Sequence, residues 1–333
     1  MKVHAATPPT LSLVVPVYNE RETIPAFYDR ATRALASLQV PYEILFVDDG
    51  SRDGSFEQLR ALAESDPRVK VVSFSRNFGH QTAVTAGLHY AQGQAVAVID
   101  GDLQDPPEFV PRLFEKWREG YQVVYAVRRS RKENIVKRAA YRLFYRLLRS
   151  LAYVDMPLDA GDFAIMDRRV VDELNAMPER NRFVRGIRAW VGFRQVGLEY
   201  DRDPRFAGES KYPLSKLLKL AYDGLISYSF APLRLATHLG FAISGVAFLL
   251  ILYLVGLRIV YGDHLIAGWT STVVVVLFLG GVQLLSLGIL GEYVGRIFDE
   301  VKRRPLYVVR ETVGLDATAA ANPGLRRAGE RIA

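Results

Sequence analysis

The chain contains no cysteine in its 333 residues. Disulfides, catalytic thiolates and cysteine-ligated zinc sites are therefore excluded. The N-terminal segment MKVHAATPPT has no apolar stretch, so we expect no signal peptide. Two nucleotide-binding signatures are also missing, since no G-x-G-x-x-G follows the first apolar run and no G-x-x-x-x-G-K-S/T lies at a predicted strand end. Their absence disfavours a dinucleotide-binding fold and a P-loop.

The composition indicates a large core and a preference for anionic partners. Hydrophobic residues make up 50% of the chain, and the formal net charge is +7. A chain of this length and hydrophobicity can build more than one structural unit. The positive charge favours phosphates, nucleic acid or a lipid surface, and the placement of charge along the chain must decide among them.

The most informative stretch is AVAVIDGDLQDPPE, residues 95–108. Its apolar, β-branched beginning predicts a buried strand of a parallel sheet. Asp100 and Asp102 follow two residues apart, so on an extended chain they project to the same side. Ligands bind at this edge of open α/β sheets, and paired carboxylates suit Mg²⁺ or Mn²⁺ shared with a substrate's phosphates. A polar turn that caps the next helix is the alternative for an isolated D-x-D.

Short apolar runs alternate with helical patterns along the first half of the chain. Buried strands are predicted at residues 11–17, 42–47, 69–75 and 95–100. Helices are predicted at residues 23–38, 55–65 and 81–91. This alternation is typical of βαβ crossovers and predicts an α/β domain with a mostly parallel sheet. The predicted strand ends are polar, which favours a nucleotide-sized site along that edge.

Two polar features near the predicted strand ends have a structural alternative. Asp48-Asp49-Gly50-Ser51 reads as a simple turn, or as a turn whose carboxylate binds a base or ribose. Among the five histidines, His80 is closest to a motif, and we expect it to cap or pack a helix.

Four motifs occur in order: VPVYNE (15–20), VDDGS (47–51), SRNFG (75–79) and DGDLQDPPE (100–108). At these intervals they resemble the family-two GT-A glycosyltransferases. The chain is most similar to the polyprenyl-phosphate group, which includes dolichyl-phosphate mannose synthase and bacterial undecaprenyl-phosphate sugar transferases. The resemblance spans residues 11–313. It implies a Rossmann-like GT-A domain at residues 11–212, and an inverting, metal-dependent transfer of a sugar from a nucleotide sugar to a polyprenyl phosphate.

The resemblance also implies a role for individual residues. Those expected at the donor nucleotide are Pro16, Tyr18, Glu20, Asp48 and Asp49, with Arg205 and Lys211 of the RFAGESKY loop closing over the diphosphate. Those expected to hold Mg²⁺ or Mn²⁺ are Asp100, Asp102 and Gln104. The acceptor phosphate is assigned to Arg128, Arg131 and Ser210. Catalysis is assigned to Asp102 and Asp162.

Several of these assignments have open alternatives. The basic run VVYAVRRSR (123–131) could be a solvated continuation of a strand into an amphipathic helix at residues 134–151, and RFAGESKY could be a connector. Gly161 stands where many relatives carry serine, which weakens the assignment of Asp162. A phosphate monoester has a second pKa of about 6, so we expect Asp162 to orient the acceptor or complete its deprotonation.

Two uncharged stretches, residues 239–257 and 265–291, are each near the roughly 20 residues that cross a bilayer. They predict transmembrane helices at residues 235–261 and 266–292. Lysines and arginines flank the outer ends of the pair, whereas the short loop between holds Arg258 alone. The positive-inside rule then places the catalytic domain and both termini in the cytoplasm, on a multi-pass protein of the inner membrane. Glycines in the spans would serve the hairpin or a homo-oligomer.

The remaining segments flank this hairpin. We predict an N-terminal tail at residues 1–10, an interfacial helix at residues 213–232, a cytoplasmic return segment at 293–313 with a short strand at 305–312, and a disordered basic tail at 314–333. A buried hairpin of a soluble core is the alternative for the two uncharged stretches.

Three functions stay open. The first is transfer of glucose from UDP-glucose to a polyprenyl phosphate, with UDP-galactose, UDP-N-acetylglucosamine, GDP-mannose or UDP-formylaminoarabinose as other donors. No nucleic acid is expected as a partner. The second is a processive polysaccharide synthase, although only Arg188-Ala189-Trp190 echoes the Q-x-x-R-W element of that group. The third is a non-catalytic membrane scaffold with a nucleotide-binding fold.

Overall fold

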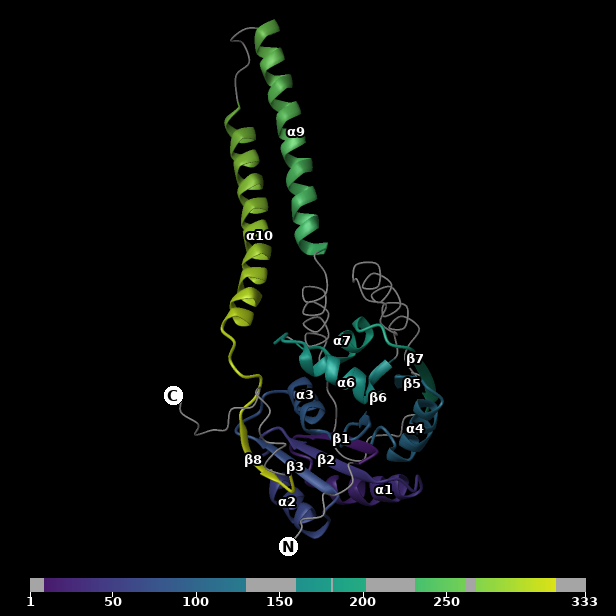
Figure 1. Ribbon diagram of the computed structural model, residues 1–333. Coiled ribbons are helices and arrows are strands. Elements are labelled where there is room, and N and C mark those ends of the chain that lie inside the picture. The colour runs from purple at the N-terminus through teal and green to yellow at the C-terminus, as the bar shows by residue number, and fades with distance from the viewer. Residues whose placement is uncertain (1–8, 130–159, 181, 202–230, 262–267, 316–333) are drawn as a thin grey trace. The chain divides into compact units, whose positions relative to one another are not determined.

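The computed structural model describes residues 9–129, 160–180, 182–201, 231–261 and 268–315. The chain divides into two compact units. One contains an eight-stranded sheet with its covering helices, and the other contains two long helices, α9 (Ala231–Tyr261) and α10 (Trp269–Val301) (Figure 1).

The sheet has the strand order β7-β5-β6-β4-β1-β2-β3-β8. Its strands are β1 (Leu11–Val17), β2 (Tyr42–Asp48), β3 (Val69–Phe74), β4 (Ala95–Val98), β5 (Val123–Arg128), β6 (Ala160–Asp167), β7 (Gln195–Tyr200) and β8 (Val309–Val313). The central strands β4, β1, β2 and β3 are parallel neighbours. The predicted mostly parallel α/β sheet is therefore confirmed.

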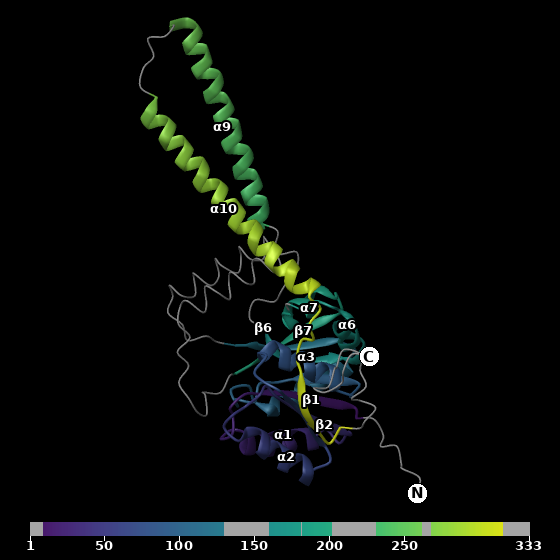
Figure 2. The same cartoon turned by 90° about the vertical axis from the view of Figure 1, so that its left-hand side faces the viewer.

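Helices cover both faces of the sheet. One core contains buried residues of α1 (Ile24–Ala36), α2 (Ser55–Ser65) and α4 (Val110–Arg118), which follows the 3-10 turn Pro107–Phe109. The other contains residues of α3 (His80–Tyr90), α6 (Arg168–Ala176) and α7 (Val184–Trp190). Figures 1 and 2 show α1 and α2 across the sheet from α3. Because side chains alternate along a strand, Leu13 packs in the first core and Val14 in the second.

The strands β6 and β7 were not predicted. β6 runs antiparallel between β4 and β5, and β7 pairs in parallel with β5 at the edge. The alternation of apolar runs with helices predicts parallel crossovers and gives no signal for an antiparallel insertion. The predicted strand at residues 95–100 is also shorter, because β4 ends at Val98 and the carboxylates belong to the following loop.

The C-terminal strand β8 pairs antiparallel with β3 and closes one edge of the sheet. This is the return strand expected from the sequence, displaced by a few residues. Tyr307, just before it, is buried and stacks on Phe74 with ring centroids 4.8 Å apart. Its hydroxyl lies 3.0 Å from Nδ1 of His89. The strand is thus held by side-chain packing as well as by backbone pairing.

The two long helices overlap the predicted transmembrane spans. α10 extends beyond the predicted end at residue 292 to Val301. Among the described residues, one segment, Phe278–Val301, is long and apolar enough to cross a membrane. The two-span hairpin is therefore unconfirmed and stays a prediction, as do the proposed domain boundaries. The predicted helix at 134–151, most of the interfacial helix at 213–232 and the terminal tails lie outside the described residues.

Candidate active site

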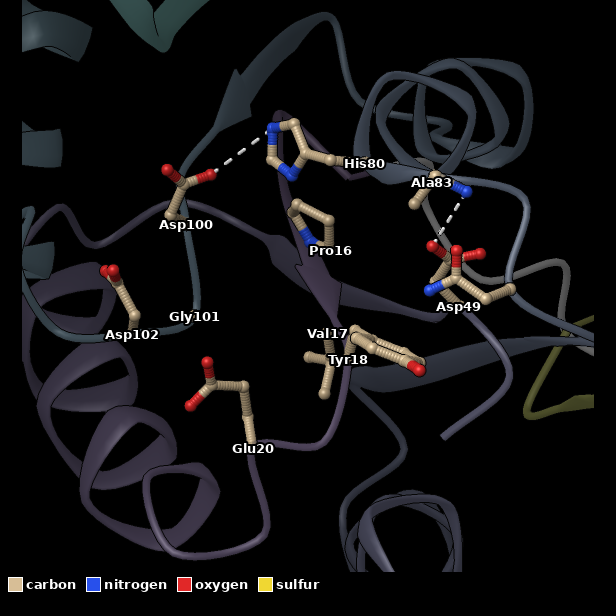
Figure 3. A pocket seen from close by; sticks show the side chains of 12 residues that line it. Pro16, Val17, Tyr18, Glu20, Asp49, His80, Ala83, Asp100, Gly101 and Asp102 are labelled. Atoms are coloured by element: carbon tan, nitrogen blue, oxygen red, sulfur yellow. Dashed lines mark hydrogen bonds and ion pairs between the residues drawn. The ribbon is translucent and has the colours of Figure 1, made fainter. Parts of the chain in front are cut away.

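A pocket of about 300 Å³ lies at the carboxyl ends of β1, β2, β3 and β4 (Figure 3). The residues that line it are Pro16, Val17, Tyr18, Glu20, Asp49, Asn77, Gly79, His80, Ala83, Asp100, Gly101 and Asp102. Parallel strands end at the same edge of a sheet, so polar residues from four consecutive βα connections meet here. The structure thus brings together six predicted site residues: Pro16, Tyr18, Glu20, Asp49, Asp100 and Asp102.

The loop after β4 is held rigidly by its buried residues. Leu103 has a φ of 60°, an uncommon conformation for a residue with a β-carbon, and its side chain is buried in the core. Asp105 is buried and accepts a hydrogen bond from the hydroxyl of Tyr200. Asp102 Oδ1 accepts a hydrogen bond of 3.1 Å from the backbone N–H of Gln104. The buried residues that follow Asp102, together with its hydrogen bond from Gln104, therefore hold its carboxylate in place.

The pair Asp100 and Asp102 fits a divalent cation. Asp100 Oδ1 is buried and has no hydrogen-bond partner among the described residues, although 35% of its side chain is exposed. Burial, reinforced by Asp105, Asp162 and Asp102, raises the pKa of Asp100 to about 6, against the opposing effect of His80. A cation bound to Asp100 would offset the energetic cost of keeping its carboxylate charged in this buried, acidic place. Asp100 and Asp102 would hold Mg²⁺ together with a substrate's phosphates and water.

Protein side chains alone do not complete such a site. In the part of the chain that the structure describes, no three Asp, Glu or His side chains are grouped to hold a metal. Gln104, the third predicted ligand, is not among the described residues that line the pocket. The substrate's phosphates and water would therefore supply the remaining ligands.

The two adjacent aspartates after β2 differ in their surroundings. Asp49 lines the pocket and accepts hydrogen bonds from the backbone N–H groups of Phe78 (2.6 Å) and Gly79 (2.9 Å). Asp48 is completely buried, and it accepts hydrogen bonds from Ser51 N–H (3.0 Å) and Ser73 Oγ (2.6 Å). Asp48 was predicted to bind the donor directly, but its carboxylate is turned into the protein. Its role in donor binding stays a prediction, and the geometry favours an indirect one.

The loop after β1 presents an aromatic ring and a carboxylate to the pocket. Tyr18 is 46% exposed, which leaves a ring face available to stack on a base. Glu20 Oε2 accepts a hydrogen bond of 3.0 Å from Thr23 Oγ1, and the Glu20 N–H donates to Ser55 Oγ at 3.0 Å. These bonds position Glu20 at the start of α1.

His80 is a pocket residue whose position differs from the one expected. It is the first residue of α3, and its Nε2 lies 3.6 Å from Asp100 Oδ1 and 3.3 Å from Asp162 Oδ2. Its ring points toward Asp100 (Figure 3). Burial opposes protonation, but the two carboxylates outweigh it and raise the pKa of His80. The structure therefore gives His80 a place in the pocket lining that the sequence did not predict, while the expected capping or packing role stays a prediction. The available signal was its place directly after SRNFG.

Asp162 on β6 lies outside the pocket lining but contacts it through His80. Its side chain is 8% exposed, and it also accepts hydrogen bonds from Gln81 Nε2 (2.9 Å) and Arg185 Nε (3.1 Å). Burial favours protonation, but the bond to His80 and the charges of Arg185 and His80 hold the pKa of Asp162 well below its usual range. The carboxylate is therefore charged and weakly basic.

Arginines gather at the start of β6. Arg128 Nε donates to the hydroxyl of Tyr200 at 3.3 Å, and a β-carbon added to Gly161 would lie 3.8 Å from Arg128 Nη2. Arg188, which the sequence offered only as a weak motif, is 3% exposed and donates to the Gly161 carbonyl at 3.4 Å. The predicted residues Arg131, Arg205, Ser210 and Lys211 lie outside the described residues, so they stay predictions.

Two solved structures resemble the chain loosely. The glucosyl-3-phosphoglycerate synthase from Mycobacterium tuberculosis, in complex with Mn²⁺, UDP and glucosyl-3-phosphoglycerate, has a TM-score of 0.43 and 23% identity, covering 66% of this chain and 78% of that one. The mannosyltransferase PcManGT from Pyrobaculum calidifontis, in complex with GDP-Man and Mn²⁺, has a TM-score of 0.41 and 17% identity, with coverages of 85% and 88%.

Curated relatives match over nearly the whole chain. An uncharacterized glycosyltransferase of Bacillus subtilis, YkcC, is 51% identical over 92% of this chain and 94% of its own. The SfII prophage-derived bactoprenol glucosyl transferase of Shigella flexneri is 44% identical over 91% of this chain and 98% of its own. The family described as Glycosyl transferase family 2 matches residues 12–174. The chain therefore belongs to glycosyltransferase family 2.

Proposed function

We propose that this enzyme transfers glucose from a nucleotide sugar, UDP-glucose first, to a polyprenyl phosphate at the cytoplasmic face of a membrane. The observation that carries the proposal is the pocket at the strand ends, where Asp100 and Asp102 lie within reach of a shared ligand and Tyr18 offers a ring face. Relatives named bactoprenol glucosyl transferase, 44% identical over 91% of this chain, support the choice of sugar and lipid.

The proposed residues have two roles, which are to bind the nucleotide and to neutralise the diphosphate as it leaves. Tyr18, Glu20 and Asp49 would bind and orient the nucleotide, because they come from neighbouring loops and line the same pocket. Asp100 and Asp102 would hold a divalent metal, which when bound supplies charge neutralisation for the leaving diphosphate. The buried Oδ1 of Asp100, which has no hydrogen-bond partner among the described residues and faces only His80 Nε2 among their ion pairs, at 3.6 Å, supports this assignment.

The proposed reaction is a single in-line displacement with inversion. An oxygen of the acceptor phosphate attacks the anomeric carbon, a new C–O bond forms, and the bond from that carbon to the diphosphate breaks as the nucleoside diphosphate leaves. The acceptor has a second pKa of about 6 and is largely dianionic at neutral pH. A strong base is therefore unnecessary, which agrees with the low basicity of Asp162.

The arginines at the start of β6 are suited to the acceptor phosphate. Arg128 and Arg185 are partly exposed cations, the first near Gly161 and the second bonded to Asp162, and guanidinium groups bind phosphate oxygens well. We assign Asp162 a positioning role, in which it keeps His80 and Arg185 in place. Arg131 and Ser210, which lie outside the described residues, would complete this proposed acceptor site.

The long apolar helices would bring the enzyme to its lipid. Phe278–Val301 in α10 has the length and composition of a span, and α9 contains a further uncharged stretch at residues 239–257. We propose that both cross the membrane as a hairpin with the catalytic domain on the cytoplasmic side, which agrees with the positive charges outside the pair. A polyprenyl phosphate carries its reactive group at the headgroup level.

A two-phase transfer assay tests the function. Full-length enzyme is incubated with Mn²⁺, polyprenyl phosphate and radiolabelled UDP-glucose, and the organic phase is counted. Lipid-dependent label in that phase is expected, and matched reactions with GDP-mannose, UDP-galactose and UDP-N-acetylglucosamine check the sugar. Label in an aqueous polymer would instead indicate a processive synthase. Nucleotide binding without transfer from any donor would indicate a scaffold.

A further inference from the structure

Arg310, on the C-terminal strand β8, has a side chain that is 44% exposed but contacts buried residues of β2 and β3. Its Nη2 donates to Ser73 Oγ at 2.9 Å and lies 3.7 Å from Asp48 Oδ2. Its guanidinium also lies over the ring of Phe56, 4.5 Å from the centroid. Arg310 therefore connects a strand near the end of the chain with residues of β3 and β2.

A line of hydrogen bonds continues from this contact toward the pocket. Ser73 Oγ donates to Asp48 Oδ2 at 2.6 Å, and Asp48 Oδ1 accepts from the Ser51 N–H at 3.0 Å. Ser51 Oγ then accepts from the N–H of Asn19 at 3.0 Å. Asn19 lies between the pocket residues Tyr18 and Glu20, and it has a φ of 54°. The backbone conformation that presents Tyr18 and Glu20 is thus tied to the buried carboxylate.

Asp48 needs a compensating charge at this place. It is completely buried, and a buried carboxylate is costly unless it is paired and hydrogen-bonded. Among the ion pairs of the described residues, the one that includes Asp48 is with Arg310, at 3.7 Å. Without the guanidinium, the negative charge of Asp48 would be stabilised only by the hydrogen bonds from Ser51 N–H and Ser73 Oγ.

We infer that Arg310 is a positioning residue for the donor site, acting through Ser73, Asp48 and Ser51 on the loop that carries Tyr18 and Glu20. The segment that follows the long helices would thereby be part of the nucleotide site, although it lies more than two hundred residues from it in sequence. This inference rests on the proposed function, because the pocket must bind a nucleotide for the positioning to matter.

Arg60 provides a matched control. It also stacks on Phe56, with a distance of 4.8 Å to the centroid, and it also anchors β8, through an ion pair of 2.5 Å with Glu311. Among the described residues, the side-chain hydrogen bond and ion pair of Arg60 go to Glu311 and not to Asp48. Arg60→Ala therefore removes a comparable arginine from the same edge and leaves the line of hydrogen bonds to Asn19 in place.

The test measures nucleotide binding by the full-length enzyme in detergent. UDP is titrated in the presence of Mn²⁺ by calorimetry, and transfer kinetics are measured with the donor and the acceptor varied separately. Arg310→Ala is expected to weaken UDP binding and raise the donor KM roughly three- to tenfold, the effect of one lost hydrogen bond. The acceptor KM should stay the same, Arg310→Lys should restore part of the affinity, and Arg60→Ala should match the wild type.

Hydrogen exchange gives a readout that does not need ligand. Faster exchange of the Asn19 and Ser51 amides in Arg310→Ala, but not in Arg60→Ala, is expected. If Arg310→Ala does not fold, Ser73→Ala replaces it, and unchanged UDP affinity in Ser73→Ala overturns the inference. Equal UDP affinity in Arg310→Ala and Arg60→Ala also overturns it and leaves the proposed function standing. A wild-type enzyme that does not bind UDP with Mn²⁺ overturns both.

Discussion

The imidazole Nε2 of His80 lies 3.3 Å from Oδ2 of Asp162, which joins the N-terminus of α3 to β6. His80 lines the strand-end pocket, whereas Asp162 belongs to the cluster with Gln81 and Arg185. The contact therefore connects the proposed donor site with the proposed acceptor side. Because the same nitrogen faces Asp100 at 3.6 Å, His80 also lies between the two carboxylates.

Replacing His80 tests this connection. His80→Ala should lower kcat roughly tenfold or more, because a hydrogen bond to a charged group contributes about 1.5–3 kcal/mol. His80→Gln retains an amide donor and should recover part of the loss. Steady-state kinetics and thermal melting are compared for all three proteins. Wild-type kinetics in a folded His80→Ala would show that the contact serves only packing.

The metal assignment predicts a large effect at Asp102. Asp102→Asn should reduce turnover about a hundredfold or more while the protein stays folded. The reason is that losing a metal-binding carboxylate weakens the stabilisation of the leaving diphosphate. EDTA should abolish wild-type activity, and Mn²⁺ should restore it. Glu108→Gln is the control from the same motif, because Glu108 is exposed and pairs with Arg30. Full activity in chelator would contradict a role for metal.

Arg128 should separate the acceptor from the donor. Arg128→Ala is expected to raise the acceptor KM roughly tenfold and leave UDP affinity unchanged, because its proposed partner is the acceptor's phosphate. Arg129→Ala, which removes an exposed neighbour paired with Glu199 and Asp201, should have little effect. Separate titrations of donor and acceptor give the two values. Equal losses for both substrates would place Arg128 at the diphosphate.

Gly50 should be sensitive to any side chain. Its φ is +70°, and an added β-carbon would meet the backbone of Arg76, which cannot move aside easily. Gly50→Ala is expected to destabilise the catalytic domain by about 2 kcal/mol or more. Gly54 also has a positive φ, +91°, but its added β-carbon would meet only the flexible side chain of Arg21 at 3.4 Å. Thermal melting should show a smaller loss for Gly54→Ala, and equal losses would exclude the steric explanation.

Asp66 should make stability depend on acid pH. Hydrogen bonds from Arg68, opposed by burial and aided by Tyr28, lower the pKa of Asp66 from 3.8 to about 2. A carboxyl with a lowered folded-state pKa stabilises the protein above about pH 4, and this contribution disappears as the pH falls through 2. Above about pH 4, the lowered pKa of Asp66 contributes about 1–2 kcal/mol to the free energy of unfolding, after allowance for the exposure of Arg68.

Asp66→Asn tests this dependence. The variant should be less stable than the wild type at pH 7, and the difference should shrink between pH 4 and pH 2. Asp29→Asn, which breaks an exposed pair with Arg33, is the control and should change stability little at either pH. Denaturation curves at several pH values give the comparison. A constant difference between Asp66→Asn and the wild type would contradict the lowered pKa.

The sequence by itself determined the central sheet and most of the donor pocket. The apolar runs that form β1 to β4 and the helices between them follow from local periodicity, and their polar ends must share one edge because the strands are parallel. Asp100 and Asp102 could be placed at this edge for this reason, and the family resemblance added Tyr18 and Glu20 to the same site. The four motifs by themselves also indicate the family.

Only the tertiary structure decided which neighbouring residues face the pocket and which distant ones support it. Adjacent residues on an extended chain point to opposite sides, so the pair Asp48 and Asp49 could not both face the ligand, and packing selected Asp49. The antiparallel strand β6 brings Asp162 to His80, and the register of β8 brings Arg310 to Ser73. These pairings depend on long-range strand order and register, which no local pattern encodes.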